Sequence, residues 1–419
     1  MWTNFSKLTY IIKNNLKVIE NYAMMTILQF LNSFFYLLIY PYIIRKLGIE
    51  NYGVFVFATG ISAYFLFFIN FGFDLPMTKA IAENIENSNE INKIFSQVFY
   101  GKIYLFGLAT LIFLALLENI EILNKNALIC SICYVTNIST IFFPQWFFQA
   151  VQNMKLVTFI QLGVKVITLP LILFLVKDKT DLSIYTFIIS LGTVLGSLIA
   201  LSLILIKYKI KIKFFSPYAL ISLFTNSFPY FLTSLAASVK EYSIPILLGS
   251  YFGMKEVAIY DLANKLIQIP RTLIMSVNIA IFPKLITNIN SSVVRKIIGI
   301  EFILSIIIIL LIVMLGKYAI IILGGNNMMQ SYYLAILLSI TVMTWLVVGA
   351  YISFVFIPNN KLYWLAQNQT LAMGSFFIIF FILIYSRLNN IYAIGVAIAL
   401  SGLLEIGYCY YMSKKYKLL

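Results

Sequence analysis

Long apolar runs, separated by short polar segments, follow one another along almost the whole chain. A helix needs about 20 apolar residues to cross the hydrocarbon core of a bilayer, and each run is about that long. Strands of a membrane barrel are about half as long and alternate at every residue, which these runs do not do. The pattern predicts about twelve membrane-spanning helices, at about residues 22–44, 53–73, 98–117, 127–148, 156–176, 184–206, 228–249, 256–282, 298–323, 332–357, 365–385 and 391–412.

The composition agrees with an all-α integral membrane protein. Of the 419 residues, 61% are apolar and only 11% are charged, and the mean hydropathy is +0.94. A soluble domain carries about 25% charged residues, and no polar stretch here is long enough to fold as a domain outside the membrane. The sequence has no histidine, which excludes catalytic triads and metal sites that need it. We expect no metal and no catalytic residues.

The positive charges are unevenly distributed among the loops. If the N-terminus, the even-numbered loops and the C-terminus share one side, that side holds more than half of the 30 Lys and Arg, with Lys79, Lys93 and Lys102 assigned to the second loop. Such loops stay in the cytoplasm, so both termini are predicted to be cytoplasmic in a multi-pass plasma-membrane protein. The net charge of +15 then reflects orientation and contact with anionic membrane lipids, and nucleic acid is not expected as a partner.

A weak internal repeat divides the chain into two halves. GIENYGVFVFA at residues 48–58 aligns with GMKEVAIYDLA at residues 253–263, and each segment follows a proline, Pro41 or Pro245. Six predicted helices separate the copies, so the two halves have the same orientation in the membrane. We predict an N-terminal six-helix lobe at 1–206, a basic cytoplasmic linker at 207–217 and a C-terminal six-helix lobe at 218–419, with a substrate held between the lobes.

The eighth predicted span has a charged face. At about 100° per residue, Asp261, Lys265 and Gln268 fall on one side of the helix, with Arg271 at the edge of that side. A charge at the centre of the bilayer costs about 2.5–3.5 kcal/mol on insertion scales. We therefore expect this face to contact protein or water rather than lipid.

Two further spans repeat the design. The seventh carries Thr233, Lys240 and Glu241 on one face, and the first carries an uncharged polar face. Together these spans are predicted to line a hydrated cavity, whose substrate-binding residues are Gln29, Asn32, Tyr36, Lys165, Thr233, Lys240, Lys265, Gln268 and Arg271.

Structural explanations stand beside these functional ones. Asp261 and Lys265 are four residues apart, the spacing of an ion pair that merely holds helices together. Lys165, isolated in the fifth span, fits a cavity or a structural role equally well. Glu301 and Glu405 lie near predicted cytoplasmic ends, where snorkelling or helix capping accounts for them. The two cysteines of the CxxC motif at 130–133 lie in an apolar run and are expected to serve packing.

Three segments resemble one family: RKLGIENYG at 45–53, NFGFDLPMTKAIAE at 70–83 and FFPQWFFQAVQNMK at 142–155. They are similar to the polysaccharide transport family of the MOP superfamily, in particular its O-antigen (Wzx-type) flippases. The resemblance implies a V-shaped, two-lobe transporter without enzymatic activity. Such a protein moves undecaprenyl-diphosphate-linked oligosaccharide units from the inner to the outer leaflet of the bacterial inner membrane, with other polysaccharide-assembly proteins as possible partners.

The charge of the predicted cavity favours this substrate over the alternatives. Its four cations outnumber its two acids, Glu241 and Asp261, and a diphosphate binds cations. A multidrug antiporter of the same superfamily would more often carry acids for cationic drugs. A polysaccharide polymerase or ligase would carry one large outer loop, and a scaffold would not need charged spans. No nucleotide-binding loop is present, so H⁺ or Na⁺ is the expected energy source, with Glu241 and Asp261 as the ion-coupling candidates.

Overall fold

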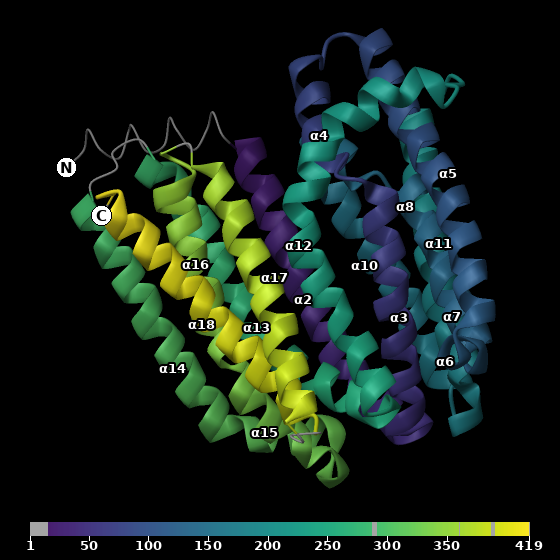
Figure 1. Cartoon of the computed structure of the whole chain (residues 1–419). Coiled ribbons are helices and arrows are strands. Elements are labelled where there is room, and N and C mark those ends of the chain that lie inside the picture. The colour runs from purple at the N-terminus through teal and green to yellow at the C-terminus, as the bar shows by residue number, and fades with distance from the viewer. Residues whose placement is uncertain (1–15, 287–290, 360, 387–389, 419) are drawn as a thin grey trace. The chain divides into compact units, whose positions relative to one another are not determined.

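The computed structural model is all-helical over the residues it describes (Figure 1). These are residues 16–286, 291–359, 361–386 and 390–418, with the backbone alone for 16–19, 21–23, 29, 33, 272–286 and 362. The α-helices are α2 (Leu16–Leu47), α3 (Ile49–Asn70), α4 (Asp74–Glu83), α5 (Ser88–Asn119), α6 (Glu121–Lys125), α7 (Ala127–Val135), α8 (Ser139–Phe142), α9 (Gln145–Ala150), α10 (Met154–Leu175), α11 (Leu182–Lys207), α12 (Ile221–Tyr251), α13 (Met254–Ile286), α14 (Ser291–Gly324), α15 (Met329–Leu338), α16 (Ile340–Tyr351), α17 (Leu362–Tyr385) and α18 (Tyr392–Lys415).

Ten helical segments of the described chain are long and apolar enough to cross a membrane. They confirm the all-helical membrane fold and ten of the predicted spans. The seventh and eighth predicted spans correspond to α12 and α13, which have 31 and 33 residues but are not among the ten. These two helices carry the polar faces described above, so the total of twelve spans remains a prediction.

Two glycines aligned by the internal repeat have the same backbone role. Gly48 joins α2 to α3 with a φ of +80°, and Gly253 joins α12 to α13 with a φ of +108°. Glycine adopts this left-handed conformation readily, because it lacks the Cβ atom that makes it costly for other residues. The first two long helices of each half are therefore connected by the same kind of turn.

Contacts divide the chain into two compact units that do not follow sequence order. Unit 1 comprises Met1–Tyr36, Phe65–Val176 and Ser183–Phe231, and unit 2 comprises Leu37–Tyr64, Lys177–Leu182 and Leu232–Leu419. Helices α2, α3 and α12 each contribute residues to both units. The lobes at 1–206 and 218–419, which rest on the internal repeat, remain a prediction about symmetry. The two units are defined by packing contacts and do not test that prediction.

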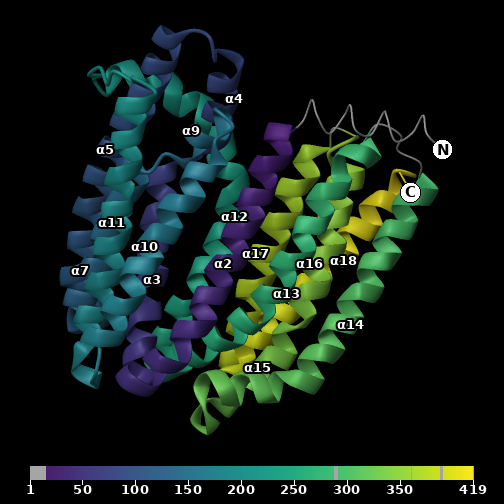
Figure 2. The same cartoon turned by 180° about the vertical axis from the view of Figure 1, so that it is seen from behind.

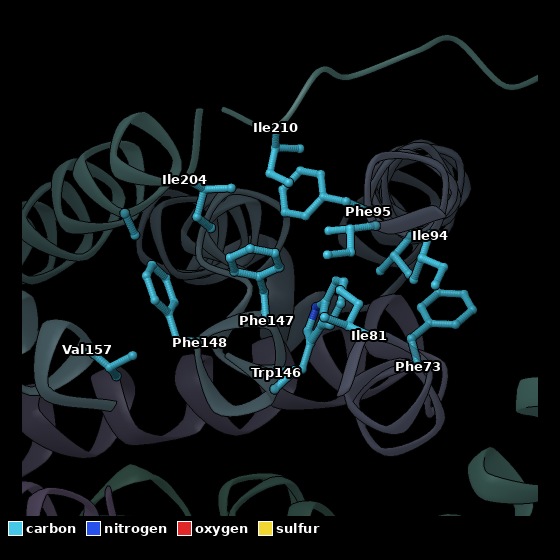
Figure 3. Packing of buried hydrophobic residues seen from close by; sticks show 14 of the residues in the cluster. Phe73, Ile81, Ile94, Phe95, Trp146, Phe147, Phe148, Val157, Ile204 and Ile210 are labelled. Atoms are coloured by element: carbon cyan, nitrogen blue, oxygen red, sulfur yellow. The ribbon is translucent and has the colours of Figure 1, made fainter. Parts of the chain in front are cut away.

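Unit 1 has an aromatic core. Phe95 of α5 and Trp146, Phe147 and Phe148 of α9 are at most 3% exposed and pack together with Phe73 (Figure 3). α4 packs against α9 and α5. Three of these aromatic residues belong to the FFPQWFFQAVQNMK segment, which explains its dense aromatic composition.

Unit 2 is built mainly from α13 to α18. α17 packs along α18, α14 along α16, and α13 against α14 and α15; α14 and α18 are seen from behind in Figure 2. One of its cores lies where the π-helix η5 (Ile352–Phe356) meets α17 and α18, with Phe356, Trp364 and Cys409 buried. Cys130, Cys133 and Cys409 are all free and buried.

Candidate functional site

The charged residues of α12 and α18 meet in unit 2. Lys240 Nζ donates to Glu405 Oε1 at 2.9 Å, and the two side chains are 17% and 10% exposed. The explanation of Glu405 as a snorkelling or capping residue is therefore wrong: it is a buried partner of Lys240, from a helix 165 residues further along the chain. Glu301, which was explained in the same way, is also buried, on α14.

Arg271 lies against an aromatic ring and near two acidic residues. Its guanidinium group lies over the ring of Trp345 of α16. The charges of Glu241 and Glu405 both act on it. Arg271 is half-buried, and the Trp345 ring covers one face of its guanidinium group. We refer to Lys240, Glu405, Arg271, Glu241 and Trp345 as the charged cluster.

Burial separates the two predicted faces of α13 only in part. Leu262 and Ala263 are fully buried, whereas Asp261, Lys265 and Gln268 are half-buried. Leu266 of the predicted apolar face is half-buried as well, so the orientation of the charged face toward water stays a prediction. Thr272, further along the charged face, lies outside the residues whose side chains the structure describes.

Asp261 also contacts the first half of the chain within unit 2. The Tyr52 hydroxyl of α3 donates to Asp261 Oδ2 at 2.8 Å. The ring of Tyr52 packs edge-on against Tyr40 of α2, with 5.2 Å between ring centroids. The two segments of the internal repeat, 48–58 and 253–263, therefore meet each other, and an aromatic hydroxyl of one bonds a carboxylate of the other.

This meeting depends on glycines. A Cβ atom at Gly53 would overlap the carbonyl oxygen of Met254, and one at Gly60 would lie 3.0 Å from Pro245. The contact at Gly53 is with backbone, which cannot rotate away as a side chain can. Gly53 therefore sets how closely α3 approaches the start of α13.

We expect Gly53→Ala to lower the thermal stability of the purified protein, because the added methyl group forces α3 and α13 apart. Overpacking of this kind costs about 1–3 kcal/mol. Gly107→Ala in α5 is the matched control, since nothing lies within 4 Å of its added Cβ. Equal melting temperatures for the two variants would contradict the close approach.

The predicted polar face of α12 is only partly distinguished by burial. Thr233 and Glu241 are exposed and Lys240 is half-buried, but Phe228 and Leu232 of the supposed apolar face are 46% and 48% exposed. Both predicted faces of α12 are thus exposed in part, and chemical labelling measures which of these residues contact water.

A cysteine at Thr233 should react with a charged, membrane-impermeant thiol reagent, because we predict that this position faces a hydrated cavity. A cysteine at Ala236, three residues further and 7% exposed, is the matched control and should stay unlabelled. The background lacks the three native cysteines. Equal labelling at the two positions, measured by mass shift, would remove α12 from the cavity.

The residues predicted on α2 lie in unit 1. Asn32 and Tyr36 are half-buried, and within the described part of the chain the side-chain oxygen of Asn32 is buried without a hydrogen-bond partner. Lys165 of α10 lies over the ring of Phe35, with Nζ 5.5 Å from the centroid. Lys165 therefore lies on the face of α10 that contacts α2. The side chain of Gln29 lies outside the residues described.

Comparison with known proteins identifies the family. Residues 18–289 match the family model described as "Polysaccharide biosynthesis protein". The chain belongs to this family.

Two curated relatives of this chain are each named "Putative O-antigen transporter". The one from Escherichia coli (strain K12) is 27% identical over 69% of this chain and 69% of its own length. The one from Shigella dysenteriae is 28% identical over 64% of this chain and 67% of its own length.

Solved structures show the fold. The lipid II flippase MurJ in an inward closed conformation has a TM-score of 0.73 at 16% identity, over 93% of this chain and 87% of that one. An inward-facing MATE multidrug transporter of the MOP superfamily has a TM-score of 0.64 at 12% identity, over 92% and 99%. This chain thus has the fold of MOP-superfamily transporters, as the resemblance implied.

The sequence analysis did not predict one polar cluster of this chain, which surrounds Lys102. Lys102 was assigned to a cytoplasmic loop, but it lies within α5 and is 3% exposed. Its Nζ donates to Asn70 Oδ1 at 2.8 Å and to the Thr140 hydroxyl at 3.3 Å, and lies 3.5 Å from Asp74 Oδ1. Asn70 and Asp74 belong to the NFGFDLPMTKAIAE segment, so the available signal was a polar family segment beside an isolated lysine in an apolar helix.

Among the described residues, no group of three or more Cys, Asp or Glu side chains is arranged to bind a metal ion. The charged cluster can form ion pairs, bind anions and exchange protons, and those are the kinds of chemistry that the proposed function uses.

Proposed function

We propose that this protein is a flippase that carries an undecaprenyl-diphosphate-linked oligosaccharide, an O-antigen or related surface-polysaccharide unit, across the bacterial inner membrane by alternating access. The observation that carries the proposal is the family match over residues 18–289 together with relatives named as O-antigen transporters. We further propose that both termini are cytoplasmic and that the protein carries out no bond-breaking reaction.

The charged cluster supports an anionic substrate. Its contacts also indicate which of the cations would bind the substrate, which a count of cations cannot do. The charge of Lys240 is already balanced by Glu405 at 2.9 Å. Arg271, which is half-buried, is then the principal candidate for the diphosphate. A planar guanidinium can bind two phosphate oxygens at once, and Trp345 holds it in one orientation.

The acids of the cluster would keep that binding reversible. Glu241 and Glu405 act on Arg271, so a diphosphate must compete with them for its positive charge. A transporter must release its substrate as well as bind it, and we propose that this competition limits the affinity. The amide of Gln268 and the hydroxyl of Thr233, both in unit 2, would contact the sugars, while the polyprenyl chain remains in lipid.

Transport in proteoliposomes tests the proposal. Vesicles would contain the purified protein and an undecaprenyl diphosphate bearing a fluorescent oligosaccharide, and an impermeant quencher added outside would report arrival in the outer leaflet. Quenching beyond one half of the signal, present with the protein and absent without it, is the expected result. Export of a cationic dye without movement of the lipid-linked sugar would favour the multidrug antiporter instead.

We propose ion coupling through Asp261 and Glu241. Asp261 accepts a hydrogen bond from the Tyr52 hydroxyl within unit 2, so a conformation that opens this contact would make the carboxylate accessible to the coupling cation. Binding of the cation would then be linked to the conformational change of transport, because it would favour one state over the other.

Asp261→Asn and Glu241→Gln should reduce the acceleration of transport by an imposed pH gradient, without removing transport down a substrate gradient. A sodium gradient applied to the same vesicles is the control, since either cation remains a candidate. If both variants respond to the pH gradient as the native protein does, these carboxylates are not the coupling groups.

A further inference from the structure

The predicted linker is an ordered strap on the surface of unit 1. Residues 208–215, which we call the strap, run along α5 after the end of α11. The backbone N–H of Lys211 donates to Asn92 Oδ1 at 3.0 Å, and that of Lys213 donates to Ser96 Oγ at 3.0 Å. Asn92 and Ser96 are four residues apart on a helix, about 6 Å along its axis. Two residues of extended chain span about the same distance, so the strap is held at every second residue.

This attachment makes the side chains of the strap alternate. Ile210 is 7% exposed and points into the unit 1 core near Phe95 and Phe147 (Figure 3). The lysines at 209, 211 and 213 are all exposed. Within the described part of the chain these three lysines form no ion pair. The strap therefore presents three exposed cations, and the backbone of two of them, Lys211 and Lys213, is held by α5.

Exposed apolar side chains flank the row at both ends. Ile206 is 76% exposed before the strap, and Phe214 and Tyr218 are 72% and 85% exposed at its far end. The Tyr104 hydroxyl of α5 donates to the carbonyl of Phe215 at 2.9 Å and holds this end in place. The strap directly follows α11, a helix apolar enough to span a membrane. Aromatic side chains beside cations at the end of a spanning helix are typical of the layer where lipid headgroups meet the hydrocarbon.

We propose that the strap is a binding site for the headgroups of anionic phospholipids. The three lysines would contact the phosphate groups, while Phe214 and Tyr218 enter the headgroup layer. Charge complementarity commits the site to an anionic lipid rather than a zwitterionic one. A flexible basic linker would attract such lipids only diffusely, whereas a strap pinned by Asn92 and Ser96 holds its cations in register. This site is independent of the transported substrate and of the charged cluster in unit 2.

Lipid enrichment next to the strap tests the proposal. The full-length protein, with its native cysteines replaced, would carry a fluorophore on Ser216→Cys, an exposed position beside the strap. It would be reconstituted in nanodiscs containing a small fraction of phosphatidylglycerol or phosphatidylcholine, each with a quenching nitroxide on its headgroup. We expect the phosphatidylglycerol probe to quench at least about fivefold more effectively, the factor of a single lysine–headgroup contact. The preference should disappear in about 1 M salt, where the screening length is about 3 Å.

Three variants test whether the preference depends on the strap or on positive charge in general. Lys209→Gln/Lys211→Gln/Lys213→Gln should abolish the preference, whereas Lys414→Gln/Lys415→Gln/Lys417→Gln removes the same charge from exposed positions near the C-terminus and should preserve it. Asn92→Ala/Ser96→Ala keeps every lysine but frees the strap, and should weaken the preference. Each variant must elute as a single species with native helical content.

Three results would overturn the proposal: equal quenching by the two lipids in the native protein, a preference that survives in the strap variant, or an equal loss in both triple variants. Saturable binding of an acidic polypeptide, in the absence of any lipid preference, would assign the strap to a protein partner instead.

Discussion

Arg271→Ala is expected to reduce transport by about 10- to 100-fold, the effect of losing a hydrogen-bonded charge contact worth about 1.5–3 kcal/mol. The guanidinium is held over Trp345 and is half-buried, so no neighbouring cation can replace it without rearrangement. Arg271→Lys keeps the charge but loses the planar fork. It should retain part of the activity if the phosphate needs only a point charge, and little if two phosphate oxygens are bound at once.

The measurement is the initial rate in the proteoliposome assay, with protein abundance determined in the same vesicles. Trp345→Leu is a useful companion, because it removes the ring and leaves the charge. It should lower the rate less than Arg271→Ala does. Full activity of Arg271→Ala would show that the diphosphate binds elsewhere, and the role proposed for the charged cluster would be wrong.

Removing one member of the Lys240–Glu405 ion pair should strongly destabilise the protein. The two side chains are 17% and 10% exposed, so the remaining charge stays largely buried without its partner. Such single removals cost about 3–5 kcal/mol. Lys240→Met and Glu405→Gln should each lower the melting temperature and the amount of protein in the membrane.

The double variant Lys240→Met/Glu405→Gln distinguishes a structural pair from a functional one. With no charge left unpaired, its stability should return most of the way to that of the native protein. Native transport by this stable double variant would make the pair purely structural. Loss of transport at restored abundance would assign a role in the substrate path to Lys240. A double variant as unstable as the sum of the single variants would contradict the coupling seen in the structure.

Local features of the fold followed from the sequence because they depend on neighbouring residues. The length of an apolar run determines whether it can form a spanning helix, and the described part of the chain contains ten such segments. The glycines at 48 and 253 end helices because a residue without Cβ turns there at low cost. The placement of Asp261 and Lys265 on one face of α13 followed from helical periodicity alone, since residues four apart lie one above the other on a helix.

The partners of the charged residues were decided by tertiary structure. Lys240 has an acid next to it in sequence, yet it pairs with Glu405, because adjacent residues on a helix point in different directions while α18 lies alongside. The sequence analysis assigned Lys102 to a loop. In the folded chain, Asn70, Asp74 and Thr140 surround its ammonium group. The segment at 207–217 was predicted as a basic linker. In the structure its backbone donates hydrogen bonds to the side chains of Asn92 and Ser96. Apolar runs and turns are properties of a few consecutive residues, whereas an ion pair depends on which helices pack together, and for Lys240 and Glu405 that partner lies 165 residues away.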